Sequence, residues 1–422
     1  MLNAVKHYVF RSYLLRIFLL VLALEAASSA MVYARFDWAR DSENPDFLER
    51  FVFTNLFVRP FMQHRYDALR KICENVVDMR NPFPWVATRI FPPEPVYGHR
   101  LGRNQCFRRK NSVIMTNDQG FSTIDSAPVT YQTEKPDGTF RAIVIGGSTV
   151  MGLGAHTPSQ NLPAYLQRRL ARKMDSTGQE VQVINAGVGG YYSVNEFLYL
   201  ASELVHFDPD LLIVYNGWND SQLFPANTTR SLHGPRANPN DRVLARGYNF
   251  GGSLLAALGN LSLMGRSIVD RSATVFLIKL VVRRVGTHEK AAAVDPRAGQ
   301  TAEDIARGIA RYERNLRLMV STAKIHGFRI AIFLQPLQYE QLGFESRDIF
   351  YDGAREMMDE LRDEFSADLD VCVADVSSSL LGEQPGSVYY DNGHLLGKGN
   401  EIVSSAILES LQACGVLNAG GT

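Results

Sequence analysis

"RAIVIGGSTVMG", Arg141 to Gly152, gives the clearest indication of the fold of this 422-residue chain. Its apolar, β-branched run predicts a buried strand, and the two glycines after it are typical of a tight turn. Ser148 follows at the carboxyl end of that strand. A serine in this position either caps the next helix or presents its hydroxyl as a nucleophile.

The same kind of strand recurs along the chain. Further apolar runs lie at 180–187, 211–217, 329–336 and 370–377, and amphipathic stretches typical of helices lie at 161–174, 193–207, 301–327, 352–365 and 398–414. Strands that alternate with helices imply crossover connections and a parallel sheet covered on both faces. We therefore expect an α/β fold, a three-layer α/β/α sandwich around a five-stranded parallel sheet, with ligands bound beyond the carboxyl ends of the strands.

Three segments lie outside this regular pattern. Residues 35–137 form an N-terminal extension rich in Phe, Pro and Arg, and the domain after it, 138–422, has an insertion at about 221–300. An insertion of that length is typically functional or disordered, and we expect it to act as a lid over the strand ends.

The first segment, residues 1–34, has the features of an export signal. Lys6, Arg11 and Arg16 precede the apolar run Ile17 to Ala34, which suits either a single membrane anchor or a cleaved signal peptide. Glu25 disfavours a firmly inserted helix, and the sequence leaves both alternatives open. In both, we expect the rest of the chain to lie outside the cytoplasm, either anchored to the membrane through this segment or secreted after cleavage. An amphipathic helix of a cytosolic protein is the third alternative.

Composition excludes some partners. Lys plus Arg (44) equals Asp plus Glu (44), so no net charge attracts nucleic acid, and we expect no nucleic-acid partner. Cys73, Cys106, Cys372 and Cys414 lack the spacing of a zinc site, so we expect no metal. Disulfides in any of three complete pairings, or buried free thiols, remain open, and so does the oligomeric state.

Several familiar glycine motifs do not fit the turn around Ser148. A phosphate-binding loop needs a lysine where the chain has Leu153, and the glycine pattern of a dinucleotide site is absent. The nucleophile elbow GxSxG needs a glycine where the chain has Val150.

Polar blocks after the other predicted strands fit better. They read "NAGVGGYY" (185–192), "YNGWNDS" (215–221) and "YYDNGHLLGKGN" (389–400). Together with the first block they resemble the SGNH hydrolases, the GDSL esterase/lipase family, over roughly 140–414. The resemblance implies a flavodoxin-like sheet, no cofactor, and a catalytic triad of Ser148, Asp391 and His394.

The same resemblance implies an oxyanion hole formed by the backbone of Ser148 and Gly190 and the amide of Asn219. One departure stands out, because Gly147 replaces the aspartate that usually precedes the nucleophile in this family. Asp220 is expected to be a structural loop acid, and Trp218 and Tyr191 either line the substrate pocket or belong to the core.

The chemistry of these residue types is coherent. A serine hydroxyl needs a base to take its proton, an imidazole can do this near neutral pH, and a carboxylate can orient that imidazole. We therefore expect an exported serine esterase that hydrolyses small acyl esters, with O-acetyl groups on a glycan as the first choice of substrate. A lipid esterase, an O-acyltransferase to a cell-envelope polysaccharide and a non-catalytic glycan-binding protein are the alternatives.

Overall fold

The computed structural model describes residues 89–109, 112–222, 301–338 and 345–417, the strand 76–78, and residues 20, 23, 26 and 27. The expected anchor or signal and the expected lid therefore lie almost entirely outside the described residues. Within the described residues, no helix has both the length and the apolar character to cross a membrane. The chain divides into two units, and the large sheet with its helices belongs to the unit of residues 75–248 and 295–422.

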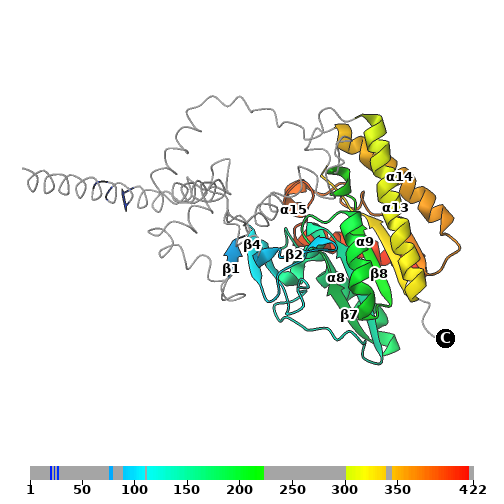
Figure 1. Ribbon diagram of the computed structural model, residues 1–422, viewed down its shortest axis with the longest axis horizontal. Coiled ribbons are helices and arrows are strands. Elements are labelled where there is room, and N and C mark those ends of the chain that lie inside the picture. Colours follow the sequence, from blue (N-terminus) through cyan, green and yellow to red (C-terminus); the bar gives the residue numbers. More distant parts are fainter. Residues whose placement is uncertain are drawn as a thin grey trace, which may run out of the picture. The chain divides into compact units, whose positions relative to one another are not determined.

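A five-stranded sheet forms the centre of this unit (Figure 1). Every neighbouring pair is parallel, and the order in space is β10-β9-β8-β6-β7. The strands are β6 (Thr139–Gly146), β7 (Glu180–Asn185), β8 (Leu211–Asn216), β9 (Arg329–Leu334) and β10 (Val371–Asp375). The predicted five-stranded parallel sheet is confirmed, and each strand lies within two residues of its predicted run.

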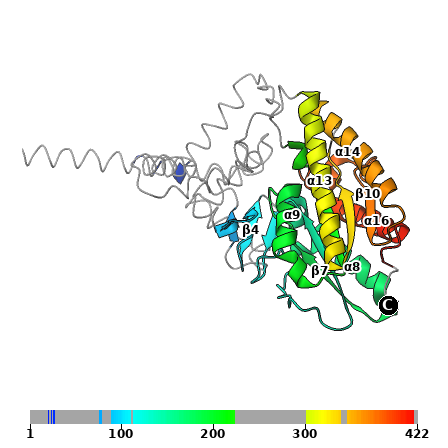
Figure 2. The same ribbon diagram turned by 45° about the vertical axis from the view of Figure 1, so that its right-hand side comes forward.

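Helices cover both faces of the sheet (Figures 1 and 2). One face packs on α8 (Leu162–Met174) and α16 (Gly397–Ala413), and the other on α9 (Ser193–Ser202), α13 (Ala302–His326) and α14 (Glu345–Glu364). Along β6, Ile143 and Ile145 join the α9 side while Ala142 and Val144 join the α8 side, because successive strand residues point to opposite faces. This confirms the predicted three-layer sandwich.

Local signals set the helix boundaries. Asn161 accepts a hydrogen bond from the Ala164 N–H at the start of α8, and Thr301 forms a capping box with Asp304 at the start of α13. Gly327 ends α13 in the left-handed conformation. The remaining helices of the described residues are short: α7 (Ser148–Met151), α15 (Pro385–Val388) and 3₁₀ turns at Pro158–Gln160, Asp175–Thr177, Leu204–Phe207 and Asp220–Gln222.

Smaller strands precede the sheet in sequence. They are β1 (Val76–Asp78), β4 (Cys106–Arg109) and β5 (Ser112–Met115) in one sheet, and the hairpin of β2 (Pro93–Glu94) and β3 (Gly98–His99). Phe91, Tyr97, Phe107, Ile114 and Phe121 are buried in the same core as α9 and α13. The described residues of the expected extension, 76–78, 89–109 and 112–137, thus belong to the compact unit that holds the large sheet.

A disulfide joins β10 to the end of α16. It links Cys372, the second residue of β10, with Cys414, directly after α16. Cys106 is disulfide-bonded as well. For Cys106, Cys372 and Cys414, these bonds remove the alternative of buried free thiols.

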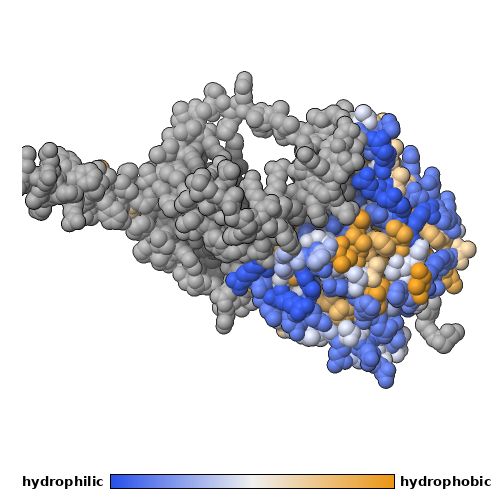
Figure 3. Space-filling model, in the orientation of Figure 1, coloured by the Kyte–Doolittle hydropathy of each residue, from blue (hydrophilic) through white to orange (hydrophobic). Residues whose placement is uncertain are grey.

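The surface seen in Figure 3 carries apolar side chains over α9 and α13. Leu318 and Ile325 on α13 are among the exposed ones. They lie in the middle and at the carboxyl end of a helix that runs away from the carboxyl edge of the sheet, so they do not line a site at that edge.

Candidate active site

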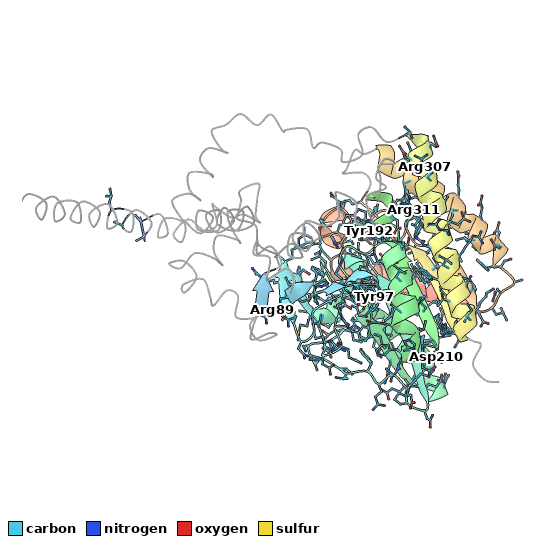
Figure 4. All side chains as sticks on the ribbon, in the orientation of Figure 1. Arg89, Tyr97, Tyr192, Asp210, Arg307 and Arg311 are labelled. Atoms are coloured by element: carbon cyan, nitrogen blue, oxygen red, sulfur yellow. A yellow bond between two sulfur atoms is a disulfide. The ribbon has the colours of Figure 1, made fainter. Side chains whose placement is uncertain are left out.

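The site lies where the strands end. In Figure 4, Tyr192 and Arg311 lie at one end of the layer formed by α9 and α13, and Asp210, which directly precedes β8, lies at the other end. Tyr192 follows β7 and precedes α9, so its end of the layer is the carboxyl edge of the sheet. Parallel α/β sheets bind ligands at this edge.

The turn after β6 presents Ser148 at this edge. Gly146 ends the strand so close to β8 that a Cβ there would collide with the Tyr215 carbonyl. Ser148 is the first residue of α7, and Gly152 ends that helix in the left-handed conformation with φ +106°. The glycines explain why the chain can turn sharply enough to place the hydroxyl beyond the strand.

The loop after α15 brings Asp391 and His394 together. Asp391 Oδ1 accepts hydrogen bonds from the backbone N–H groups of Gly393 (3.2 Å) and His394 (3.0 Å). The Tyr390 N–H donates to the His394 carbonyl at 2.9 Å. These short-range bonds fold residues 390–394 into a compact loop with both functional side chains on it.

Three side chains form a continuous chain of hydrogen bonds. Ser148 Oγ lies 2.7 Å from His394 Nε2, and His394 Nδ1 lies 2.7 Å from Asp391 Oδ1. A carboxylate can only accept, so Nδ1 of the neutral imidazole carries the hydrogen and the lone pair of Nε2 faces the serine hydroxyl. This is the arrangement in which a histidine can take a proton from a serine.

Electrostatics favour an ionised Asp391. Burial alone would raise the pKa of this carboxyl, but the hydrogen bond and charge of His394, with the backbone N–H groups, outweigh burial and hold the pKa below its usual range. Asp391 therefore stays negative at any pH at which the imidazole is neutral, and it can steady the imidazolium when His394 gains a proton.

Trp218 covers the histidine. Its ring meets the His394 ring edge to face, with centroids 4.8 Å apart at 77°. A Cβ on Gly393 would collide with the same indole. Trp218 is half-buried, so it helps to fix the imidazole and borders the site.

Asn219 lies against the turn that carries the serine. Its Nδ2 donates to the Tyr191 carbonyl at 2.7 Å, and a Cβ added to Gly147 would lie 2.7 Å from the same nitrogen. Glycine at 147 therefore leaves room for the amide. An amide nitrogen has two hydrogens, so the bond to Tyr191 leaves one for a ligand.

Gly190 lies in the loop between β7 and α9. Its φ of +83° is in the region that favours glycine. The next residue, Tyr191, supplies the carbonyl that holds Asn219. The tyrosine ring is only 1% exposed and packs in the core, so Tyr191 is a core residue and does not line a pocket.

A buried polar network supports the loop 216–220, which contains Asn219. Asp220 accepts from the Ser193 hydroxyl at 2.6 Å and from the Ser193 N–H, and Glu196 accepts from the Asn216 side chain. Tyr312 donates to Asn216 Oδ1 at 2.7 Å. Both ends of the loop 216–220 are thus bonded to α9, and Asp220 has the structural position expected of it.

Burial controls the charges in this network. Burial raises the pKa of Glu196 well above its usual value, and the negative charge of Asp220 raises it further. Burial also raises the pKa of Asp220 to about 6, although the hydrogen bonds from Ser193 act to lower it. Sequence reasoning did not single out Glu196, because a glutamate in an amphipathic helix pattern has the appearance of a solvent-exposed residue.

The described residues contain no group of three or more His, Cys, Asp or Glu side chains arranged to hold a metal ion.

Besides Glu196, sequence reasoning missed His99, whose ring is hydrogen-bonded to the loop that contains Gly190. No local pattern marks His99, since its partner Gly189 is 90 positions away.

Several solved structures are similar to this chain. A lipase from a goat rumen metagenome is 14% identical, with 66% of this chain and 98% of that chain covered and a TM-score of 0.40. An acetyl xylan esterase is 13% identical (64% and 100% covered, TM-score 0.37). A two-domain esterase active on acetylated mannans is 12% identical (66% and 50% covered, TM-score 0.36).

No curated protein sequence matches the chain. The sequence profile of the GDSL-like lipase/acylhydrolase family, in contrast, matches residues 144–402, which is more than half of the chain. The match begins inside β6 and ends inside α16, so it contains every block with a side chain in the hydrogen-bonded site. The chain belongs to the GDSL-like lipase/acylhydrolase family.

Proposed function

We propose that this protein is a serine ester hydrolase in which Ser148 is the nucleophile, His394 the base and Asp391 the residue that orients the base. The observation that carries the proposal is the unbroken chain from Ser148 Oγ through both ring nitrogens of His394 to Asp391, with 2.7 Å at each step. Membership of an acylhydrolase family supports the same chemistry.

The reaction has two steps. Ser148 Oγ attacks the acyl carbon while His394 Nε2 takes the hydroxyl proton, and the tetrahedral intermediate collapses as the leaving alcohol receives that proton. Water then attacks the acyl-enzyme, gives a proton to the same nitrogen, and releases the acid with Ser148 protonated again. Asp391 compensates the imidazolium charge in both steps.

The negative oxygen of the intermediate needs donors. The free hydrogen of the Asn219 amide and the backbone N–H groups of Ser148 and Gly190 are the donors we propose. Removing one such donor typically costs about 10²- to 10³-fold in kcat. Support for Asn219 comes from its position against Gly147, next to the nucleophile.

We propose that the enzyme works outside the cytoplasm on a small ester, first of all an O-acetyl group on a glycan. The basic and apolar N-terminal segment supports export, either membrane-anchored or after cleavage. The disulfide Cys372–Cys414 supports it too, since such bonds persist in oxidising compartments.

The test is ester hydrolysis by the full-length chain beside Ser148→Ala, His394→Ala and the control His206→Ala. His206 is an exposed histidine in the 3₁₀ turn that precedes β8, so it lies beyond the amino end of that strand, whereas the site lies at the carboxyl edge of the sheet. Turnover of p-nitrophenyl acetate should fall by at least about 10³-fold in the first two variants and stay unchanged in the third. Equal rates in all four proteins would overturn the proposal.

Substrate preference is measured next. Acetate esters and acetylated xylan should react faster than p-nitrophenyl octanoate, whereas the opposite order would favour a lipid ester. A deacetylated glycan added as acceptor should leave the rate of acid release unchanged. Acetyl groups appearing on that acceptor by mass spectrometry would instead identify an acyltransferase.

A further inference from the structure

We propose that His99 is a positioning residue for the oxyanion donors, held there by a hairpin that lies outside the part of the chain matched by the family. The inference rests on the proposed function, because it concerns the donors used in that reaction. We call residues 90–102 the His99 hairpin and residues 186–192 the Gly190 loop. The family match begins only at residue 144.

The His99 hairpin is a regular element. Pro93 pairs with His99 and Glu94 with Gly98 in the antiparallel ladder. The ladder continues outward through backbone bonds from Arg100 N–H to the Pro92 carbonyl (3.0 Å) and from Gly102 N–H to the Ile90 carbonyl (2.8 Å). A paired backbone of this kind can hold a side chain in a fixed place.

Two reciprocal hydrogen bonds join the hairpin to the Gly190 loop. His99 Nε2 lies 2.9 Å from the Gly189 carbonyl oxygen, and since a carbonyl only accepts, Nε2 carries the hydrogen. In return, the Tyr191 hydroxyl donates to the His99 carbonyl. The two hydrogen bonds involve Gly189 and Tyr191, the residues on either side of Gly190, so they fix the direction of the peptide groups around Gly190.

Ring packing surrounds these bonds. The His99 ring meets Phe91 and Tyr191 edge to face, with centroids 5.3 and 5.2 Å apart. Phe91 also lies against Gly189, where an added Cβ would be 3.2 Å from its ring. His99 is only 7% exposed, so water cannot easily replace the hydrogen bond to Gly189 and its loss would be costly.

The Gly190 loop in turn holds Asn219. The Tyr191 carbonyl accepts from Asn219 Nδ2 at 2.7 Å, one residue away from the Gly190 N–H. A shift of this loop would therefore move two proposed oxyanion donors together. Donors are effective only within a few tenths of an ångström of the place where the charge develops.

The hairpin is also bonded to α9, at a point away from His99. The Tyr97 hydroxyl donates to Glu203 at the end of that helix, and Asn195 donates to the Tyr97 carbonyl at 3.1 Å. Figure 4 shows Tyr97 beside α9. The Tyr97 hydroxyl bonds to the helix and not to the Gly190 loop, and its removal leaves the Asn195 bond and the hairpin ladder in place. Tyr97→Phe is therefore a matched control for Tyr191→Phe.

The test compares His99→Leu, His99→Gln and Tyr191→Phe with the control Tyr97→Phe, all in the full-length chain. Kinetic constants for p-nitrophenyl acetate are expressed per Ser148 labelled by a fluorophosphonate, which removes differences in folded fraction. Glutamine can place an amide N–H close to the place of His99 Nε2, so His99→Gln is the conservative variant.

We expect kcat to fall at least about 10-fold in His99→Leu and about 5-fold in Tyr191→Phe, with KM within about 3-fold of the parent. His99→Gln should recover most of the kcat, and Tyr97→Phe should keep it although it also loses a hydrogen bond. The pH profile of kcat/KM should keep its shape in all variants, since His99 does not exchange protons with substrate.

Unchanged kcat in both His99→Leu and Tyr191→Phe would overturn the inference, and so would an equal loss in Tyr97→Phe, because the effect would then be general packing. If His99→Leu does not fold, the two tyrosine variants decide. A parent chain that hydrolyses no ester and whose Ser148 takes no label would overturn the proposed function and the inference with it. An active parent with normal variants overturns the inference alone.

Discussion

Asp391 Oδ1 is bonded to both the ring and the backbone of His394, at 2.7 Å from Nδ1 and 3.0 Å from the amide nitrogen. One oxygen thus fixes the fold of the loop and the orientation of the imidazole at once. The separation of three residues makes this possible, because the loop only has to close on itself.

Replacing that carboxylate should disable the site without unfolding it. Asp391→Asn keeps the shape of the side chain but presents an amide that can also donate to His394 Nδ1. The imidazole then carries its hydrogen on Nε2, so no lone pair faces Ser148. We expect kcat to fall by about 10³- to 10⁴-fold in steady-state hydrolysis of p-nitrophenyl acetate. A loss of less than about 5-fold would argue against the orienting role of Asp391.

Gly147 offers a test of the space beside the nucleophile. In Gly147→Ala, the new methyl group would meet Asn219 Nδ2, which lies 2.7 Å from its position. The amide has to move, so we expect kcat to fall about 10-fold or more while the melting temperature changes little. Gly386→Ala is the matched control, since a Cβ there meets nothing within 4 Å. Equal kcat in both variants would contradict the prediction.

Asp220 makes stability depend on pH in an unusual direction. Burial raises its pKa to about 6 in the folded protein, above about 3.9 in an unfolded chain. The folded state therefore binds the proton more tightly than the unfolded chain does. The resulting contribution to the free energy of unfolding is full below about pH 4 and is lost as pH rises through 6.

The measurement is thermal unfolding from pH 4 to 8 for the parent and Asp220→Asn, which cannot titrate. The stability of the parent relative to the variant should fall by on the order of 2–3 kcal/mol between pH 4 and 7 and then stay level. A difference that rises with pH would mean that the Asp220 carboxyl has a lowered pKa instead.

The disulfide should contribute to stability and not to catalysis. Cys372 and Cys414 are 42 residues apart in sequence, and closing a loop of that size in the unfolded chain is worth up to about 4 kcal/mol. Cys372 lies near the start of β10, at the edge of the sheet opposite the site. We expect the double variant Cys372→Ala/Cys414→Ala to melt lower at unchanged kcat, and a fall in kcat at a temperature where it is folded would show otherwise.

Sequence reasoning located the five strands and the five long helices because those signals are local. The β-branched run of β6 predicts a strand from its own residues, and the amphipathic pattern of residues 301–327 predicts α13 in the same way. The family resemblance then indicated Ser148, Asp391 and His394, and the structure brings these three side chains into hydrogen-bond contact.

The role of individual side chains was less predictable. Tyr191 could line a pocket or belong to the core, and Gly147 was simply a departure from the family pattern. The structure gives a reason for each, because the Tyr191 ring packs among α9 and the His99 hairpin and the Asn219 amide occupies the space beside Gly147. Neither contact leaves a periodic signal in the sequence.

Short-range hydrophobic patterns and turn residues were enough to predict the α/β layers, the parallel sheet and a serine at a strand end. The packing of residues 90–102 on the Gly190 loop, in contrast, is visible only in the folded structure. The two His99 contacts there join residues that are 90 and 92 positions apart in sequence. A local sequence pattern does not specify such a pairing, because these residues meet only when the core forms.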